Sequence, residues 1–185
     1  MWALPIDAAT QIGAYRPDLI DESEIPSTWD QVLELAKQNR VLWPLKPVDA
    51  MCSFNSLAAN LGSPIGQCGK LGPFIDEQAG QTVLAAMQEI ACHLPSVCLR
   101  LDPPALLDWM SRSNNQQYAY CPLLYGYTNY SRPAFADRLI HFTNIPALGT
   151  NGPIGTQLGG TGLAISAACA NPSVALDYAF WLASA

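Results

Sequence analysis

The sequence predicts an α/β fold in which a mixed sheet is flanked by helices. Three observations support this prediction: helix-capping signals followed by amphipathic stretches, short apolar runs between them, and a composition that is 50% apolar. Helices that alternate with short apolar strands are typical of α/β domains. A chain of 185 residues is long enough for one ordinary domain or two small ones, and it can bury about two-thirds of its unfolded surface.

Caps and helix breakers mark five helices. The clearest begins at Thr28, because Thr28 and Gln31 form a capping box behind Pro26, and its apolar stripe ends near Asn39. The other four are expected at residues 49–61, 76–91, 102–110 and 171–184. Each of these four starts at an Asp or Asn that can cap the first turn, and the last two have Pro in that turn.

Short apolar runs bounded by turn residues predict the strands. Two of them flank an expected turn at residues 7–9, and the others alternate with the helices. The expected strands are residues 2–5, 11–15, 41–45, 117–124, 138–142 and 162–168. Residues 62–73 and 146–161 are rich in Gly and Pro, so we expect loops there.

Composition and charge exclude several classes of protein. Nine basic and 15 acidic residues give a net charge of −6, and 13% charged residues are too few for a disordered chain or a coiled coil. The acidic balance argues against a nucleic-acid partner. No run of 18 apolar residues predicts a membrane span, and residues 2–5 lack the basic start of a signal peptide, which indicates a cytosolic protein or a trimmed chain.

The sequence predicts neither a metal site nor a cofactor. Six cysteines are present without a CxxC pair, and only two histidines could assist them, so a zinc site is not expected. We expect Cys52, Cys92 and Cys169 to be buried thiols, because their neighbours are mostly apolar. The glycines at residues 152–162 lack the Gly-Lys-Ser/Thr and GxGxxG patterns of nucleotide-binding loops.

Tyrosines gather in one uncharged stretch. Five of the seven tyrosines fall within residues 118–130, and no charged residue lies between 113 and 131. A tyrosine ring offers a flat apolar face and a polar tip, which suits a sugar or polyol. We therefore interpret Tyr125, Tyr127 and Asn129 as ligand contacts, whereas Tyr118 and Tyr120 fit strand packing. The uncharged stretches are equally consistent with core and with the lining of a cleft for a neutral ligand.

An enzyme remains the alternative class. Cys121 could act as a nucleophile with His141, or two carboxylates could act on a glycosidic bond. Neither arrangement has the local sequence of a known catalytic motif, and two buried residues on neighbouring strands are the simpler explanation of Cys121 and His141.

Three segments resemble a known family. Residues 2–19 (WALPIDAATQIGAYRPDL), residues 26–36 (PSTWDQVLELA) and residues 158–181, which contain LGGTGLAIS and NPSVALDYAFW, occur in the same order in extracellular solute-binding proteins of ABC importers, the family 1 or sugar-binding type. Arg16 and Pro17 stand where that family has Asn and Lys, which is a departure from its pattern.

The resemblance implies a periplasmic-binding-protein type II-like lobe and a partial chain. Members of that family form two lobes, and their chains cross between the lobes about three times. By this resemblance residues 1–13 are a crossover from the first lobe, residues 14–157 form the second lobe, and residues 158–185 return to the first lobe. It also implies a periplasmic or extracellular protein whose signal peptide lies upstream of this segment.

The resemblance further implies ten ligand-binding residues in cleft-facing loops and strands. They are Asp7, Gln11, Trp43, Lys46, Asp49, Tyr125, Tyr127, Asn129, Gly160 and Thr161. Core packing is the alternative for Trp43, and a mutual ion pair is the alternative for Lys46 and Asp49.

The implied function is capture of a small solute, most simply a sugar or polyol, for delivery to the membrane permease of an ABC importer, without catalysis. The alternatives are a hydrolase that uses Cys121 or a carboxylate, a binding protein for a small carboxylate that reaches Lys46, and an interaction domain without a ligand. Without the first lobe, Ile165 and the helix face with Val174, Tyr178 and Leu182 lack a partner, so we expect residues 162–185 to self-associate or fold back.

Overall fold

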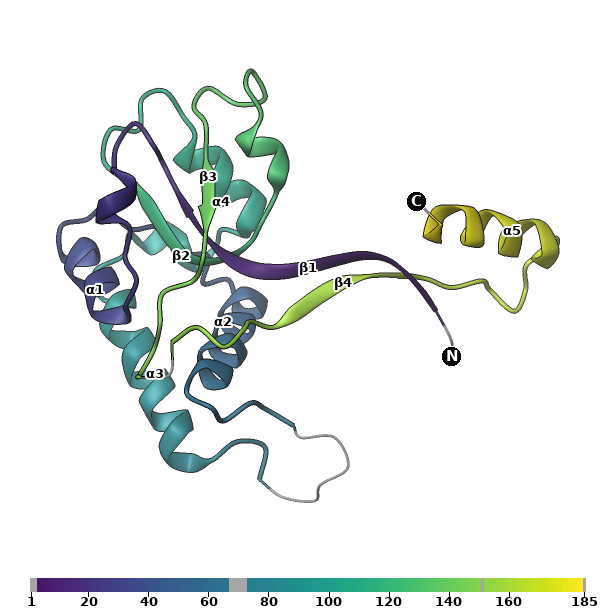
Figure 1. Ribbon diagram of the computed structural model, residues 1–185, viewed down its shortest axis with the longest axis horizontal. Coiled ribbons are helices and arrows are strands. Elements are labelled where there is room, and N and C mark those ends of the chain that lie inside the picture. Colours follow the sequence, from purple (N-terminus) through teal and green to yellow (C-terminus); the bar gives the residue numbers. More distant parts are fainter. Residues whose placement is uncertain (1–2, 67–72, 151, 185) are drawn as a thin grey trace. The chain divides into compact units, whose positions relative to one another are not determined.

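The computed structural model describes residues 3–66, 73–150 and 152–184 (Figure 1). The chain divides into two compact units. We call Gln11–Gln157 the central unit, and Met1–Thr10 with Leu158–Ala185 the terminal unit. None of the helices in the described ranges is both long and apolar enough to cross a membrane.

The central unit holds a three-stranded sheet and most of the helices. Its strands are the second half of β1 (Leu4–Tyr15), β2 (Tyr120–Tyr125) and β3 (His141–Thr143), in the order β2-β1-β3. The α-helices are α1 (Trp29–Lys37), α2 (Pro47–Asn60), α3 (Glu77–Ala91) and α4 (Pro103–Met110). Three 3-10 helices, η1 (Glu22–Glu24), η2 (Ser96–Leu99) and η3 (Thr128–Ser131), were not predicted.

The named strands pair antiparallel, and parallel pairing is confined to two isolated bridges. Tyr15 lies between Tyr120 of β2 and His141 of β3, whereas the parallel bridges join Thr28 to Ala147 and Val41 to Tyr120. The sheet is therefore antiparallel where the prediction had a mixed sheet, and the predicted α/β class with flanking helices is confirmed.

The local helix signals are confirmed, and the extended segments account for most differences. Helix α1 begins behind Thr28, whose side chain accepts a hydrogen bond from the Gln31 backbone N–H, and the Gln31 side chain completes the capping box. Helix α2 begins at Pro47, before the predicted cap at Asp49. Residues 41–45 were predicted to be a strand, but only Val41 forms a bridge.

Two further strand predictions were wrong in detail. The turn expected at residues 7–9 is absent, because β1 continues through it while pairing with β4 (Leu158–Leu163). Strand β4 begins within the stretch predicted to be a glycine-rich loop and ends before the predicted end at residue 168.

The core of the central unit is built around two tryptophans. Trp43 is 0% exposed and packs edge-to-face on Trp29 of α1, with 5.3 Å between ring centroids. Residues from every α-helix of this unit and from β1 and β2 join the same cluster. Helix α3 also packs against both α1 and α2.

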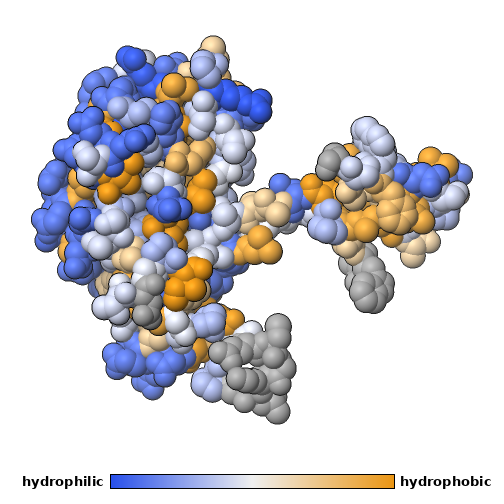
Figure 2. Space-filling model, viewed as in Figure 1, coloured by the Kyte–Doolittle hydropathy of each residue, from blue (hydrophilic) through white to orange (hydrophobic). Residues whose placement is uncertain are grey.

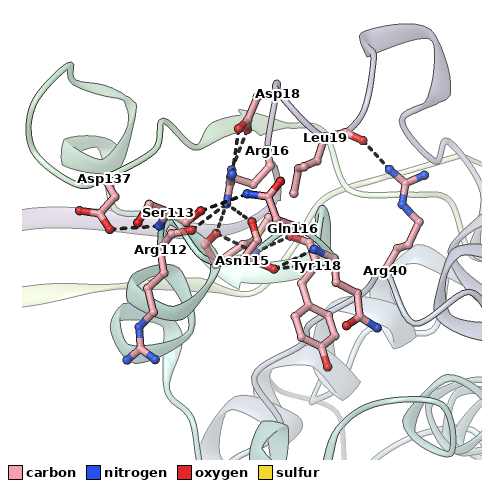
Figure 3. Close-up of polar contacts among 12 residues, drawn as sticks. Arg16, Asp18, Leu19, Arg40, Arg112, Ser113, Asn115, Gln116, Tyr118 and Asp137 are labelled. Carbon is pink, nitrogen blue, oxygen red and sulfur yellow. Dashed lines mark hydrogen bonds and ion pairs between the residues drawn. The ribbon is translucent and has the colours of Figure 1, made fainter.

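A buried arginine ties the end of β1 to the end of α4 (Figure 3). Arg16 is 0% exposed and donates to the backbone oxygens of Met110 and Asn115, at 2.6 and 3.4 Å. Its Nε and Nη2 donate to both carboxylate oxygens of Asp18, at 2.7 and 2.8 Å. The buried Arg16 guanidinium is thus hydrogen-bonded to a carboxylate and to backbone oxygens. Its structural role is to hold the end of β1 against the end of α4.

The terminal unit is a two-stranded ribbon followed by helix α5 (Pro172–Ala183). In the ribbon, Leu4–Thr10 pair antiparallel with Leu163–Leu158. Gly160 has φ +150° and an added Cβ would collide with the carbonyl oxygen of Asp7, so this strand pairing requires a glycine.

Helix α5 exposes most of its apolar side chains (Figure 2). Val174 and Tyr178, which were expected to lack a partner without the first lobe, are exposed, as are Phe180 and Trp181. Of the hydrophobic residues described in the terminal unit, Ala179 alone is buried.

The described cysteines are free thiols. Cys52 is buried as predicted, Cys169 is half-buried, and the prediction for Cys92 is wrong, because that residue lies exposed at the end of α3. Cys68 lies outside the described residues.

Candidate functional site

The N-terminal half of α2 and the end of β2 bring several of the predicted residues together. Asp49 lies in the first turn of α2, and Tyr125 is the last residue of β2. Tyr125 lies near Cys52, one turn beyond Asp49, and interacts electrostatically with both residues. Burial, followed by Cys52 and Asp49, raises the pKa of Tyr125 to about 12, so its hydroxyl keeps its proton at neutral pH.

Asp49 is a buried carboxylate with an unused acceptor. It is 6% exposed, and its Oδ2 has no hydrogen-bond partner among the described residues. Burial and the neighbouring carboxylate of Asp102 raise the pKa of Asp49, and Lys46 partly opposes them. Such an oxygen is unusual in a folded protein and favours a hydrogen-bond donor that comes from outside the described protein groups.

The alternative interpretation, an ion pair between Lys46 and Asp49, is wrong, because Lys46 pairs with Asp102. Its Nζ lies 3.4 Å from Asp102 Oδ2, and both side chains are about half exposed. Asp102 also caps α4 through the backbone N–H of Ala105, and this hydrogen bond is the main reason for its lowered pKa. Lys46 is therefore already paired with a carboxylate at the rim of the site.

Gln11 and Trp43 are hydrogen-bonded to the helix that carries Asp49. The Gln11 Nε2 and Trp43 Nε1 groups both donate to Ser53 Oγ, each at 3.2 Å, and Ser56 Oγ donates to Gln11 Oε1 at 2.6 Å. Gln11 and Trp43 are buried, and these hydrogen bonds hold them against α2; their contact with a ligand stays a prediction.

The segment after β2 presents Tyr127 and Asn129 to solvent. Tyr127 is 44% exposed and precedes η3, which Tyr130 anchors by donating its hydroxyl proton to Asp108. Gly126 has no room for a Cβ, because Ile12 of β1 lies against it. Tyr125 is therefore half-buried at the end of β2, and Tyr127 and Asn129 are exposed in the segment that follows it.

The remaining predicted residues lie in the terminal unit. Asp7 pairs with Thr161, Ala8 pairs with Gly160, and all four residues are exposed in the ribbon. Seven of the ten predicted residues therefore belong to the central unit and three to the terminal unit.

Sequence reasoning missed Ser53, Ser56, Cys52 and Asp102. A helical signal for the first three was available, since positions 49, 52, 53 and 56 share one face of a helix that starts near residue 47. Asp102 had no such signal, because it reaches Lys46 across 56 residues of sequence.

Neither nucleophilic catalysis at Cys121 nor metal chemistry finds support in this geometry. The Cys121 side chain is fully buried, burial raises the pKa of its thiol well above the ordinary value, and its Sγ–H donates to the Leu123 carbonyl. His141 instead lies beside the Tyr15 hydroxyl. The described residues contain no group of three or more His, Cys, Asp or Glu side chains that could hold a metal ion.

Comparisons with known proteins identify the fold. No protein-family model matches the sequence, and a sequence search finds no matching curated protein. The solute-binding protein of an ABC transporter from Agrobacterium radiobacter K84, solved with ribitol, matches with a TM-score of 0.76 and 20% identity over 98% of this chain and 49% of that chain. The solute-binding protein from Agrobacterium vitis S4 with bound D-mannitol matches with a TM-score of 0.73 and 16% identity over 99% of this chain and 47% of that chain.

A third structure, the solute-binding protein from Thermotoga lettingae TMO bound with α-D-tagatose, has a TM-score of 0.75 and 16% identity over 98% of this chain and 49% of that chain. The chain therefore spans about half the length of the solved structures that it matches. These likenesses confirm the expected fold, which is that of solute-binding proteins of ABC transporters.

Proposed function

We propose that this chain is part of a solute-binding protein that captures a neutral sugar or polyol and presents it to the membrane permease of an ABC importer. In this proposal residues 14–157 form one lobe, and residues 1–13 and 158–185 are crossings to the other. The protein works outside the cytoplasm and catalyses no reaction. The fold shared with binding proteins for ribitol, D-mannitol and α-D-tagatose supports the proposal.

The observation that carries the choice of ligand is the unpartnered Asp49 Oδ2 near Tyr125, which neutral polar residues follow in the chain. Sugar and polyol hydroxyls are donors that a carboxylate such as Asp49 can accept. The Tyr125 and Tyr127 rings offer faces for the C–H surface of the ligand, and the Asn129 amide can both donate and accept. Asp49 Oδ2 is buried, so in this proposal a neighbouring side chain moves to let a ligand hydroxyl reach it.

The same geometry disfavours a small carboxylate as the ligand. The carboxyl groups of Asp49 and Asp102 are neighbours, and Lys46 is the basic side chain that interacts with both. Since Lys46 already pairs with Asp102, an anion would have to displace that carboxylate. In the proposed mechanism the central unit thus contributes acceptors for ligand hydroxyls and aromatic faces for its C–H surface. Closure over the solute occurs by hinge motion of the whole protein.

The test is an NMR titration of the 185-residue chain with ribitol, D-mannitol, D-tagatose and acetate. We expect saturable shifts of amides at residues 46–52 and 125–129 with the three neutral solutes and none there with acetate. The affinity should be millimolar or weaker, at most about −4 kcal/mol, because one lobe supplies half of the contacts. Tyr125→Ala and Tyr127→Ala should abolish saturation in the accessible range without a change in melting temperature.

Tyr178→Ala is the matched control, since Tyr178 is an exposed tyrosine of α5 outside the candidate site. If Tyr178→Ala weakens binding as much as Tyr125→Ala, or if acetate saturates the same amides, the proposed site is wrong. Chemical conversion of any of these solutes by the chain would contradict the proposed non-catalytic role.

A further inference from the structure

A cavity in the central unit lies beside Tyr15, at the C-terminal end of β1, and shares no residue with the candidate solute site. It measures about 560 Å³, and we call it the Tyr15 groove. Its lining residues are Tyr15, Glu22, Ile25, Pro26, Ser27, Phe142, Thr143, Asn144, Ile145 and Pro153. Gln11, which pairs with Tyr125, is four residues from Tyr15, so the two places are separated by about 13 Å along the strand.

Hydrogen bonds connect the chain segments that form the groove at both of its ends. At one end the backbones of Ser27 and Trp29 bond to Ala147, with N···O distances of 2.8 and 2.9 Å. At the other end the Tyr15 hydroxyl lies 3.3 Å from Glu22 Oε1 and 3.4 Å from His141 Nδ1. Between these hydrogen bonds the two chain segments remain apart, so the cavity exists without a ligand-induced rearrangement.

The polar side chains of the groove are the Glu22 carboxylate, three hydroxyls and the Asn144 amide, and Glu22 supplies acceptors only. The Tyr15 hydroxyl donates to Glu22 Oε1 at 3.3 Å and lies 3.4 Å from His141 Nδ1; both distances are longer than an ordinary O–H···O hydrogen bond, so the Glu22 carboxylate keeps acceptor capacity. The Ser27 hydroxyl donates its proton to Gln31 Oε1, which leaves its oxygen as an acceptor. Glu22 carries the one formal charge among the described lining residues, and none of them is Lys or Arg.

The remaining walls are apolar. Ile25, Pro26 and Pro153 contribute aliphatic surface, and Phe142 adds an aromatic ring. A ligand that suits this arrangement has a cationic N–H donor at one end and a short hydrocarbon body behind it. An ammonium group can satisfy the carboxylate and the hydroxyl oxygens together with its three donors, and a charge-assisted hydrogen bond is stronger than a neutral one.

We propose that the Tyr15 groove is a binding site for a primary alkylammonium group, with Glu22 as its counter-ion and Tyr15 as its second polar contact. The group is either a free amine or the side chain of a lysine in a partner protein. The proposal is independent of the solute site, because it uses no residue of that site.

The experiment is an NMR titration of the 185-residue chain with pentylammonium chloride, compared with pentan-1-ol, which has the same hydrocarbon body without the charge. We expect saturable shifts for pentylammonium, confined to the amides of residues 15, 22–27 and 142–145, and no saturation with pentan-1-ol. Binding of pentan-1-ol with equal affinity would overturn the proposal, since the groove would then recognise only hydrocarbon.

Two variants localise the charge. Glu22→Gln should weaken pentylammonium binding at least about tenfold, because the ion pair is lost. Glu24→Gln is its matched control: it makes the same charge change in η1 at a residue that is outside the lining of the groove, and binding should be unchanged. An equal loss in both variants would show non-specific attraction to the acidic surface and would also overturn the proposal.

Tyr15→Phe gives a further check, because it removes the hydroxyl and keeps the ring. We expect a several-fold weaker affinity, and an unchanged affinity would remove Tyr15 from the proposed site. Should Glu22→Gln disturb the fold, the comparison of pentylammonium with pentan-1-ol on the unaltered chain still decides the matter. A parallel titration with Nα-acetyl-lysine methylamide separates the two sources, since tighter binding than pentylammonium indicates a lysine side chain and weaker binding indicates a free amine.

Discussion

The two halves of strand β1 have very different surroundings. Residues 11–15 belong to the central unit, where they lie between β2 and β3, and Gln11, Ala14 and Tyr15 are buried. Residues 4–10 belong to the terminal unit, where they pair with β4, and most of their side chains are exposed. One continuous strand therefore crosses from a packed core into a ribbon that covers little apolar surface.

This difference shows that hydrogen-bonded strand geometry and tertiary stability are separate matters. The central unit combines its strands with four α-helices that bury their apolar faces. The terminal unit has the backbone pairing and one helix, but its described hydrophobic side chains remain largely exposed. Because burial of apolar surface is the main driving force of folding, we expect the two units to respond differently to equivalent substitutions.

The largest contrast is expected between two tryptophans. Trp43→Ala should lower the free energy of unfolding by about 3–5 kcal/mol, because it empties a large site in the core of the central unit. Trp181→Ala should change it by less than about 0.5 kcal/mol, because Trp181 of α5 is 67% exposed. Urea unfolding followed by circular dichroism at 222 nm measures both, and similar losses would contradict the difference between the units.

A glycine substitution should affect the terminal unit alone. Gly160→Ala introduces a side chain at φ +150° against the Asp7 carbonyl, and such strain costs on the order of 1–3 kcal/mol. Amides of residues 4–10 should then exchange faster with solvent, while those of residues 11–15 keep their protection. Thr161→Ala serves as the control in the same strand. Faster exchange in residues 11–15 as well would show that the two halves of β1 open together.

The helix caps of the two units offer a smaller contrast. Thr28→Ala should destabilise the central unit by about 1 kcal/mol, because the Thr28 side chain caps α1. Asn171→Ala should have no measurable effect, since the Asn171 side chain makes no capping hydrogen bond to α5. Melting curves of the two variants test this expectation, and it is wrong if Asn171→Ala is the more damaging change.

The smallest expected effects come from two carboxyl groups of the central unit with opposite pKa shifts. The hydrogen bond from Arg16 holds the pKa of Asp18 below its ordinary value, so its stabilisation is present above the unfolded pKa, near 4, and is lost as the pH falls through the folded pKa. Burial raises the pKa of Asp49, so the protein loses stability as the pH rises through that group's unfolded and then folded values.

Asp18→Asn should therefore lower the melting temperature at pH 7 and have little effect at the acid end. Asp49→Asn should raise it at pH 7 and also weaken polyol binding, because a buried charge and its acceptor are both removed. Melting temperatures between pH 3 and pH 7 distinguish these cases. A fall in stability for Asp49→Asn at pH 7 would show that the ionised carboxylate has a stabilising partner.

Local signals in the sequence predicted the helices well, and non-local pairing limited the rest. The capping box at Thr28 acts within four residues, so it can be recognised directly. Residues 7–9 looked like a turn because their partners in β4 lie about 150 residues later. In the candidate site Tyr125 and Asp49 were predicted, but the enclosure of Trp43 and the Lys46–Asp102 pair depend on distant segments that composition and periodicity do not reveal.

The two ends of the central unit meet. Thr156 Oγ1 donates to the Gln11 carbonyl at 3.0 Å, although the two residues are separated by 145 positions in sequence. A domain whose first and last residues are neighbours has the topology of an insertion, in which one continuous module is spliced into a host through two adjacent strands of chain. Residues 11–157 could accordingly be excised, or circularly permuted by joining these ends through a short linker, with the buried Trp29 and Trp43 retained.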